Sequence, residues 1–134
     1  MSQIIEVEGI GEVYGGKLKE AGIATSEALL KEGASRAGRK KIEDATGIGG
    51  ALILRWVNHV DLFRIKGVQG HYAELLEAAG VDSIPELSHR VPAHLHAKIV
   101  EVNAAKSLVG KLPTEDQIAG WIEQAKALPR IVTH

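Results

Sequence analysis

Three glycine-rich turns are the segments of this sequence whose residue types suit a chemical task. They are Gly9-Ile10-Gly11, Gly47-Ile48-Gly49-Gly50 and Lys66-Gly67-Val68-Gln69-Gly70, and a helical pattern follows each one. Glycine permits the positive φ of a tight turn, and the unpaired amides at a helix start carry partial positive charge. Amides arranged in this way bind anions such as phosphate. The turns are therefore candidates for contact with a nucleic-acid backbone.

Basic side chains near the turns would assist such a contact. Arg36, Arg39 and Lys40 are spaced three and four residues apart, which places them on one face of a helix. The complete set of nucleic-acid-binding candidates is Gly9, Gly11, Lys17, Arg36, Arg39, Lys40, Lys41, Gly47, Gly49, Gly50, Lys66, Gly67 and Gly70. The alternative interpretation is a solvated helix face, balanced by nearby acidic residues such as Glu43.

Several features weigh against phosphate binding. Glu8 and Glu12 flank the first turn, and an acid there repels a phosphate by about 1 kcal/mol in a solvated setting. In the third turn Gln69 replaces the second glycine, which blocks close approach of the backbone unless Gly70 shifts the turn by one residue. The chain has 16 basic and 17 acidic residues, so its formal charge is −1. It lacks the excess of positive charge that is typical of nucleic-acid-binding proteins.

Other kinds of site are not indicated by the sequence. Of the six histidines, His94 and His96 lie two apart in a helical pattern and point about 200° away from each other. The chain has no cysteine, and it lacks a nucleophile elbow, a Walker loop and a dinucleotide-binding fingerprint. We therefore predict a protein that is not an enzyme, with no metal site, no cofactor and no small-molecule substrate.

Length and composition predict a single cytoplasmic domain, 1–134. Hydrophobic residues make up 45% and charged residues 25%, as in ordinary globular proteins. The segment MSQIIEVEG has no basic region followed by an apolar stretch, and no apolar run approaches the ~18 residues of a membrane span. We expect no membrane association.

An internal repeat defines the elements that position the turns. The segments EGIGEVYGGKLKEAGI and KGVQGHYAELLEAAGV align at a constant offset of 58 positions (67 minus 9). The paired residues are Gly9/Gly67, Tyr14/Tyr72, Leu18/Leu76, Ala21/Ala79 and Gly22/Gly80. Trp56 and Trp121 are 65 apart, so the second half has gained about seven residues (65 minus 58) near 103–113. The repeat predicts two related halves, 1–65 and 66–134, with the paired aromatic residues in the core rather than stacked on bases.

Helical patterns fill both halves, and strand patterns are almost absent. Capping residues and stop glycines predict about eight short helices, over 12–21, 25–30, 35–45, 50–61, 71–79, from 83, 92–105 and 114–128. We predict an all-α fold with two pseudo-symmetric four-helix halves. We also expect the last helix, 114–128, to pack beside the first turn and close the fold, either within one chain or between two chains of a swapped dimer.

The Gly-Ile-Gly turns, each leading into a helix, resemble helix-hairpin-helix motifs, and Lys66-Gly67-Val68-Gln69-Gly70 resembles a third, degenerate copy. Segments such as LILRWVNHVDLFRIKGV and LHAKIVEVN are similar to an uncharacterised bacterial family of tandem helix-hairpin-helix proteins, almost end to end. That family has no established activity. Related modules in repair enzymes, ligases and polymerases imply contact with DNA backbone without sequence preference, sometimes helped by a monovalent cation bound to turn carbonyls.

These observations support two hypotheses about function. The first is a non-enzymatic protein-interaction or scaffolding module, whose partner is another protein or a second copy of the chain. The alternative is non-sequence-specific binding of a DNA or RNA backbone through the glycine turns and the basic helix Arg36–Lys41. The near-neutral charge favours the first hypothesis, and the intact Gly-Ile-Gly turns favour the second.

Overall fold

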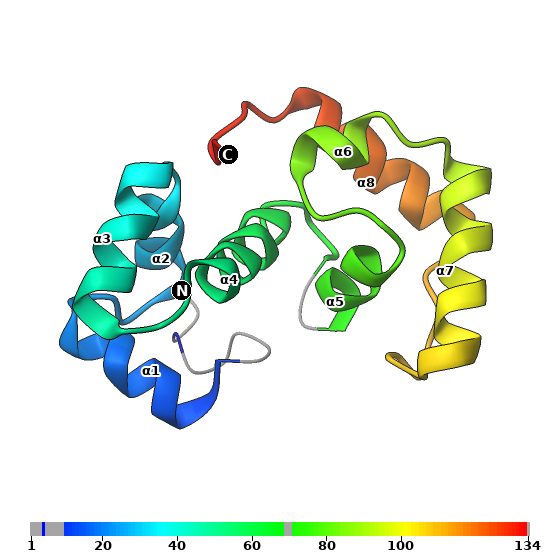
Figure 1. Cartoon of the computed structure of the whole chain (residues 1–134). Helices are drawn as coiled ribbons and strands as arrows, with labels where there is room; N and C mark the ends of the chain where they lie inside the picture. Colours follow the sequence, from blue (N-terminus) through cyan, green and yellow to red (C-terminus); the bar gives the residue numbers. More distant parts are fainter. Residues whose placement is uncertain (1–3, 5–9, 69–70, 134) are drawn as a thin grey trace. The chain divides into compact units, whose positions relative to one another are not determined.

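The structure, a computed structural model, describes residues 4, 10–68 and 71–133, and these form eight α-helices joined by short connections (Figure 1). The helices are α1 (Gly11–Glu20), α2 (Ser26–Gly33), α3 (Arg36–Thr46), α4 (Gly50–Leu62), α5 (His71–Ala78), α6 (Ile84–Ser88), α7 (Pro92–Lys106) and α8 (Glu115–Ala127). No strand is found within these ranges. The prediction of an all-α fold is therefore confirmed. None of the helices so described is long and apolar enough to cross a lipid bilayer.

The chain divides into two compact units. Unit 1 consists of Met1–Asp61 together with Ile131–His134, and unit 2 consists of Leu62–Arg130. Unit 1 contains α1 to α4, apart from the last residue of α4, and unit 2 contains α5 to α8. The chain thus leaves unit 1 once and returns to it at Ile131, so unit 2 is an insertion in unit 1.

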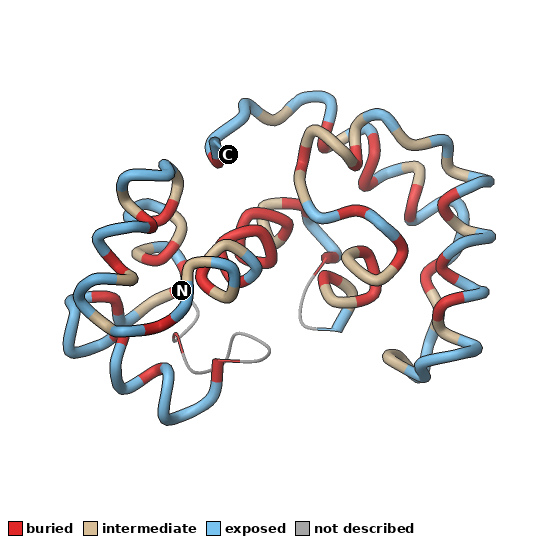
Figure 2. The backbone as a smooth tube through the Cα atoms, viewed as in Figure 1, coloured by how far each residue is buried: buried red, intermediate tan, exposed pale blue. Residues whose placement is uncertain are grey.

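Helix caps explain where the helices of unit 1 begin. The Thr25 hydroxyl accepts a hydrogen bond from the Ala28 amide (3.1 Å), and the Ser35 hydroxyl accepts one from the Gly38 amide (3.0 Å). Helix α2 packs against α3, and α1 contacts α3. The ring of Tyr14 on α1 lies on Trp56 of α4, with the ring centroids 5.2 Å apart. Figure 2 shows α4 as a mainly buried helix, as its apolar sequence requires.

Unit 2 is built around α8. This helix packs against α6 and α7, and α5 packs against α7. It starts with a complete capping box, in which the Thr114 hydroxyl accepts from the Gln117 amide and the Gln117 side chain accepts from the Thr114 amide. Trp121 of α8 lies on Tyr72 of α5, with ring centroids 5.6 Å apart.

The aromatic pairs show which helices pack together inside each unit. In unit 1, Trp56 of α4 lies against Tyr14 of α1. In unit 2, Trp121 of α8 lies against Tyr72 of α5. The expected packing of the last helix, 114–128, beside the first turn is a contact between the two units, or between two chains, and it stays a prediction.

Residues that match in the sequence repeat have matching local geometry. The φ angles of Gly22 and Gly80 are 89° and 95°, in the left-handed region that favours glycine. After each glycine the chain turns back onto its helix through the same bond, from Ile23 N to Leu18 O and from Val81 N to Leu76 O, both at 2.8 Å. The next helix then starts with a hydroxyl cap, at Thr25 and at Ser83.

Replacing Gly16 by alanine is expected to stabilise the protein by about 0.5–1 kcal/mol, because glycine is a poor residue for a helix interior. Gly16 is exposed inside α1, and a Cβ built there has no neighbouring atom within 4 Å. The change in the free energy of unfolding can be measured by urea denaturation. Gly22→Ala is the matched control, and it should destabilise the protein because its φ is positive.

Candidate functional site

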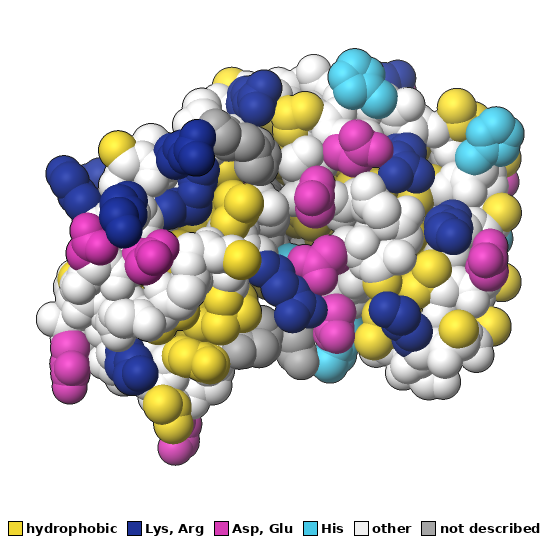
Figure 3. Space-filling view, viewed as in Figure 1, with side chains coloured by type: hydrophobic (Ala, Val, Ile, Leu, Met, Phe, Trp, Pro, Cys, Tyr) yellow, Lys and Arg dark blue, Asp and Glu magenta, His cyan; other side chains and the backbone are white. Residues whose placement is uncertain are grey.

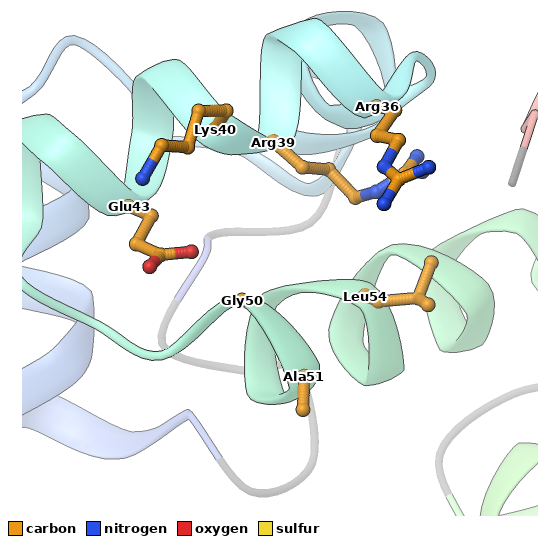
Figure 4. A pocket seen from close by; sticks show the side chains of 7 residues that line it. All are labelled: Arg36, Arg39, Lys40, Glu43, Gly50, Ala51 and Leu54. Carbon is orange, nitrogen blue, oxygen red and sulfur yellow. The ribbon is translucent and has the colours of Figure 1, made fainter.

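A cavity of about 580 Å³ lies between α3 and the first turn of α4. Figure 4 shows the side chains around it, which belong to Arg36, Arg39, Lys40, Glu43, Gly50, Ala51 and Leu54. The cavity brings together four of the residues that the sequence singled out, Arg36, Arg39, Lys40 and Gly50. It is the place where the second glycine turn would meet a phosphate.

The second turn is held in place by Thr46. The Thr46 hydroxyl donates to the Ile42 carbonyl (2.7 Å) and accepts from the Ile48 amide (3.1 Å). Gly47 ends α3 in the left-handed conformation, with φ 74°. Ile48 is 3% exposed and fixes the turn to the core, while Gly49 remains exposed. One of the turn amides, that of Ile48, is therefore already used by the protein itself.

An acidic side chain covers the start of α4. In Figure 4 the carboxylate of Glu43 extends from α3 toward Gly50. A Cβ built on Gly50 would lie 2.7 Å from Glu43 Oε2, so the carboxylate lies directly against the first residue of α4. A negative charge at a helix N-terminus stabilises the helix by about 0.3–1 kcal/mol. Glu43 therefore places a negative charge beside the start of α4, where it would repel an external anion.

Arg39 is a buried structural residue. It is 7% exposed, and its guanidinium donates to three carbonyls, Gly33 O (2.9 Å), Ala34 O (3.2 Å) and Thr133 O (2.7 Å). Burial lowers the pKa of Arg39 below its ordinary value, and the nearby charge of Arg36 lowers it further. The hydrogen bonds fasten the C-terminal segment of unit 1 to the connection between α2 and α3.

The other basic residues of α3 face solvent. Arg36, Lys40 and Lys41 are exposed, and Lys40 pairs with Asp44 at 3.3 Å, each side chain being 65% exposed. An exposed pair of this kind contributes less than about 1 kcal/mol. Figure 3 shows Lys and Arg side chains gathered over the N-terminal end of α3, with acidic side chains beside them. Lys41 lines a separate cavity of about 480 Å³, next to Gly22 and Ala45.

The third turn is a packing surface for α8. The Gln124 side chain accepts from the Lys66 amide (2.8 Å) and donates to the Lys66 carbonyl (3.2 Å). Gly67 has φ 96°, and a Cβ there would lie 2.9 Å from Trp121 Nε1. Only glycine suits this turn, because a side chain would be strained and would clash with the tryptophan. The turn is thus engaged within unit 2, and Gly70 lies outside the described residues.

The first turn is described only in part, since Gly9 also lies outside the described residues. Gly11 begins α1 with φ 66°, and no side chain caps this helix. Lys17 is exposed in the last turn of α1. In the ranges that the structure covers, no three histidine, aspartate or glutamate side chains come together as metal ligands would.

Sequence reasoning missed Gln124 and the structural roles of Glu43 and Arg39. Glu43 was considered only as a balancing charge, although its position seven residues before Gly50 brings it across the turn to the helix start. Gln124 and the three-carbonyl role of Arg39 carry no local pattern in the sequence, because their partners lie far along the chain.

The described residues form an all-α protein of two compact units, in which glycine turns precede helices. The chain belongs to the DUF4332 family, a domain of unknown function, whose model matches residues 8–128. A search of curated proteins found no match, and a search of solved structures found none.

Proposed function

We propose that the protein is a non-enzymatic interaction or scaffolding module, which works by binding another protein. The observation that carries this proposal is the position of Glu43, since its carboxylate lies beside Gly50 at the start of α4 and would repel a phosphate there. The burial of Arg39 supports it as well, because the guanidinium is engaged with three carbonyls of its own chain. The third turn is likewise engaged by Gln124.

We further propose that the two units are copies of one tandem helix-hairpin-helix element, related by pseudo-symmetry. The matching φ angles of Gly22 and Gly80 and the matching Tyr–Trp pairs support this proposal. The glycine turns then persist in the protein for a structural reason, because they let helices pack closely.

The second candidate is binding of a nucleic-acid backbone, and one observation favours it. Arg36 and Lys40 are exposed and line the same cavity as the first turn of α4. For this function, the Glu43 carboxylate would have to move away from the start of α4 when a phosphate binds there.

Replacing Glu43 by glutamine distinguishes the two candidates. If the protein binds only other proteins, neither the wild type nor Glu43→Gln should bind a short DNA duplex at low salt. If the turn binds phosphate, Glu43→Gln should bind up to about ten-fold more tightly than the wild type, because a repulsive charge has been removed. Fluorescence anisotropy with a labelled duplex at two salt concentrations measures both quantities.

Glu27→Gln is the matched control. Glu27 is an exposed acid in the first turn of α2, so the variant has the same net charge without changing the cavity. Equal gains in both variants would indicate a general charge effect. Binding by the wild type with a log–log salt slope of about −0.9 per phosphate contacted would overturn the interaction proposal.

A further inference from the structure

We infer that the exposed face of α1 in unit 1 binds a short extended segment of a partner protein, with leucine or valine anchors next to an acidic residue. In unit 2, residues 108–112 of the chain itself cover the equivalent face of α5, and we refer to them as the covering loop. The inference deepens the proposed function and rests on it, since it names the partner surface and assumes that the two units are copies.

The covering loop is fixed firmly within unit 2. Helix α7 ends at Lys106, with Ser107 as its C-cap, and the Asn103 side chain then accepts from the Val109 amide (3.0 Å) and donates to the Val109 carbonyl (3.1 Å). The apolar loop residues Leu108, Val109 and Leu112 pack against the core of unit 2. The Tyr72 hydroxyl donates to the Lys111 carbonyl (2.9 Å). The loop thus contributes apolar anchors and a backbone acceptor for the tyrosine.

Unit 1 has the same aromatic pair, but among its described residues no segment corresponds to the covering loop. Helix α3 has 11 residues against 15 in α7, and α4 starts four residues after α3 ends (50 minus 46). Helix α8 starts nine residues after α7 ends (115 minus 106). Tyr14 is 36% exposed and Val13 is 73% exposed. Within the described residues the Tyr14 hydroxyl has no hydrogen-bond partner, so the acceptor that Lys111 supplies in unit 2 is missing here.

The charges on α1 indicate which residue the partner should carry. Lys17 follows Val13 by four residues and Tyr14 by three, so it lies on the same face of α1. It forms no ion pair with another described residue. Its counterpart in α5 is the buried, apolar Leu75 (58 positions later), so this face is basic beside the tyrosine in unit 1 and apolar in unit 2. A segment that docks on α1 should consequently have an acidic residue in the place of Lys111.

Peptides derived from the covering loop provide direct probes. The first peptide, SLVGELPT, has the sequence of residues 107–114 with Lys111 replaced by glutamate, and the second, SLVGKLPT, is unchanged. A third peptide has alanine in place of the two leucines and the valine. Titration of the full chain, followed by amide shifts in NMR, should give shifts centred on residues 13–19. The glutamate peptide should bind a few-fold more tightly than the lysine peptide at low salt, with the difference shrinking as salt is added.

Two variants test the contacts themselves. Tyr14→Phe keeps the ring on Trp56 and removes the hydroxyl, so it should lower the affinity for the glutamate peptide by about five-fold. Val13→Ser should lower this affinity by a similar factor, whereas Tyr72→Phe should leave it unchanged. The inference is overturned if the shifts fall on other helices, if the alanine peptide binds equally well, or if millimolar peptide gives no shifts. Since the DNA titration tests the proposed function independently, the two failures can be told apart.

Discussion

Replacing Arg39 by methionine is expected to lower the free energy of unfolding by about 2–4 kcal/mol. Methionine fills a similar volume but leaves the carbonyls of Gly33 and Thr133 without the donor that each has now. The buried Gly33 carbonyl, left without a partner, costs about 1–3 kcal/mol, and the partly buried Thr133 carbonyl costs less because water can reach it. Ala34 O retains the Thr133 amide at 2.8 Å and should contribute less. Burial of the charged guanidinium is itself unfavourable, as the lowered pKa of Arg39 indicates. Because methionine carries no charge, this cost disappears in the variant, which limits the total loss of unfolding free energy.

Urea denaturation followed by circular dichroism measures this loss. Arg36→Met is the matched control, because Arg36 is exposed on the same helix, and its effect should stay within about 0.5 kcal/mol. Arg39→Lys should recover only part of the loss, since an ammonium lacks the fork that reaches several carbonyls at once. Equal stability of the two methionine variants would contradict the structural role of Arg39. Arg39 would then again be a candidate for contact with a nucleic-acid backbone.

The second large effect is expected in unit 2, where Trp121→Ala should cost about 3–5 kcal/mol. Trp121 is 4% exposed and packs on both Tyr72 and the backbone of Gly67. Removing the indole leaves a cavity between α8, α5 and the third turn. The contact of α8 with the third turn would then depend on the two hydrogen bonds between the Gln124 side chain and the Lys66 backbone.

The variant also allows each unit to be followed separately. The chain has two tryptophans, Trp56 in unit 1 and Trp121 in unit 2, so Trp121→Ala leaves Trp56 as the fluorescent reporter of unit 1. Urea titration should show loss of helical signal at a lower concentration than in the wild type. Trp121→Phe is the control that keeps an aromatic ring, and it should lose less than half as much. A small effect from the alanine variant would contradict a central role of α8 in unit 2.

The helices could be predicted from the sequence because their signals are local. Hydroxyl caps at Thr25, Ser35 and Thr114 and the left-handed glycines Gly22 and Gly80 mark boundaries within a few residues. The two repeat offsets, which differ by seven residues, also predict an insertion near 103–113, and the connection from α7 to α8 is longer than that from α3 to α4. What the inserted residues do, as a loop fixed by Asn103, depends on contacts that periodicity does not report.

The candidate site was less accessible to sequence reasoning, because contacts distant in sequence decide it. A helical wheel places Arg36, Arg39 and Lys40 on one face, yet only Arg39 reaches the Thr133 carbonyl, 94 positions away. Glu43 looks like a counter-charge on the wheel, and its contact with Gly50 depends on how the turn folds back.

The return of the chain to unit 1 at Ile131 affects the order in which the molecule can assemble. Unit 2 is a continuous stretch of chain, whereas the Thr133–Ala34 bond of unit 1 joins residues 99 positions apart. The entropic cost of closing a loop grows only with the logarithm of its length, but contacts between residues far apart in sequence slow folding. Local opening is easiest near chain ends, and the hydrogen bond from the buried Arg39 guanidinium to Thr133 O opposes it here.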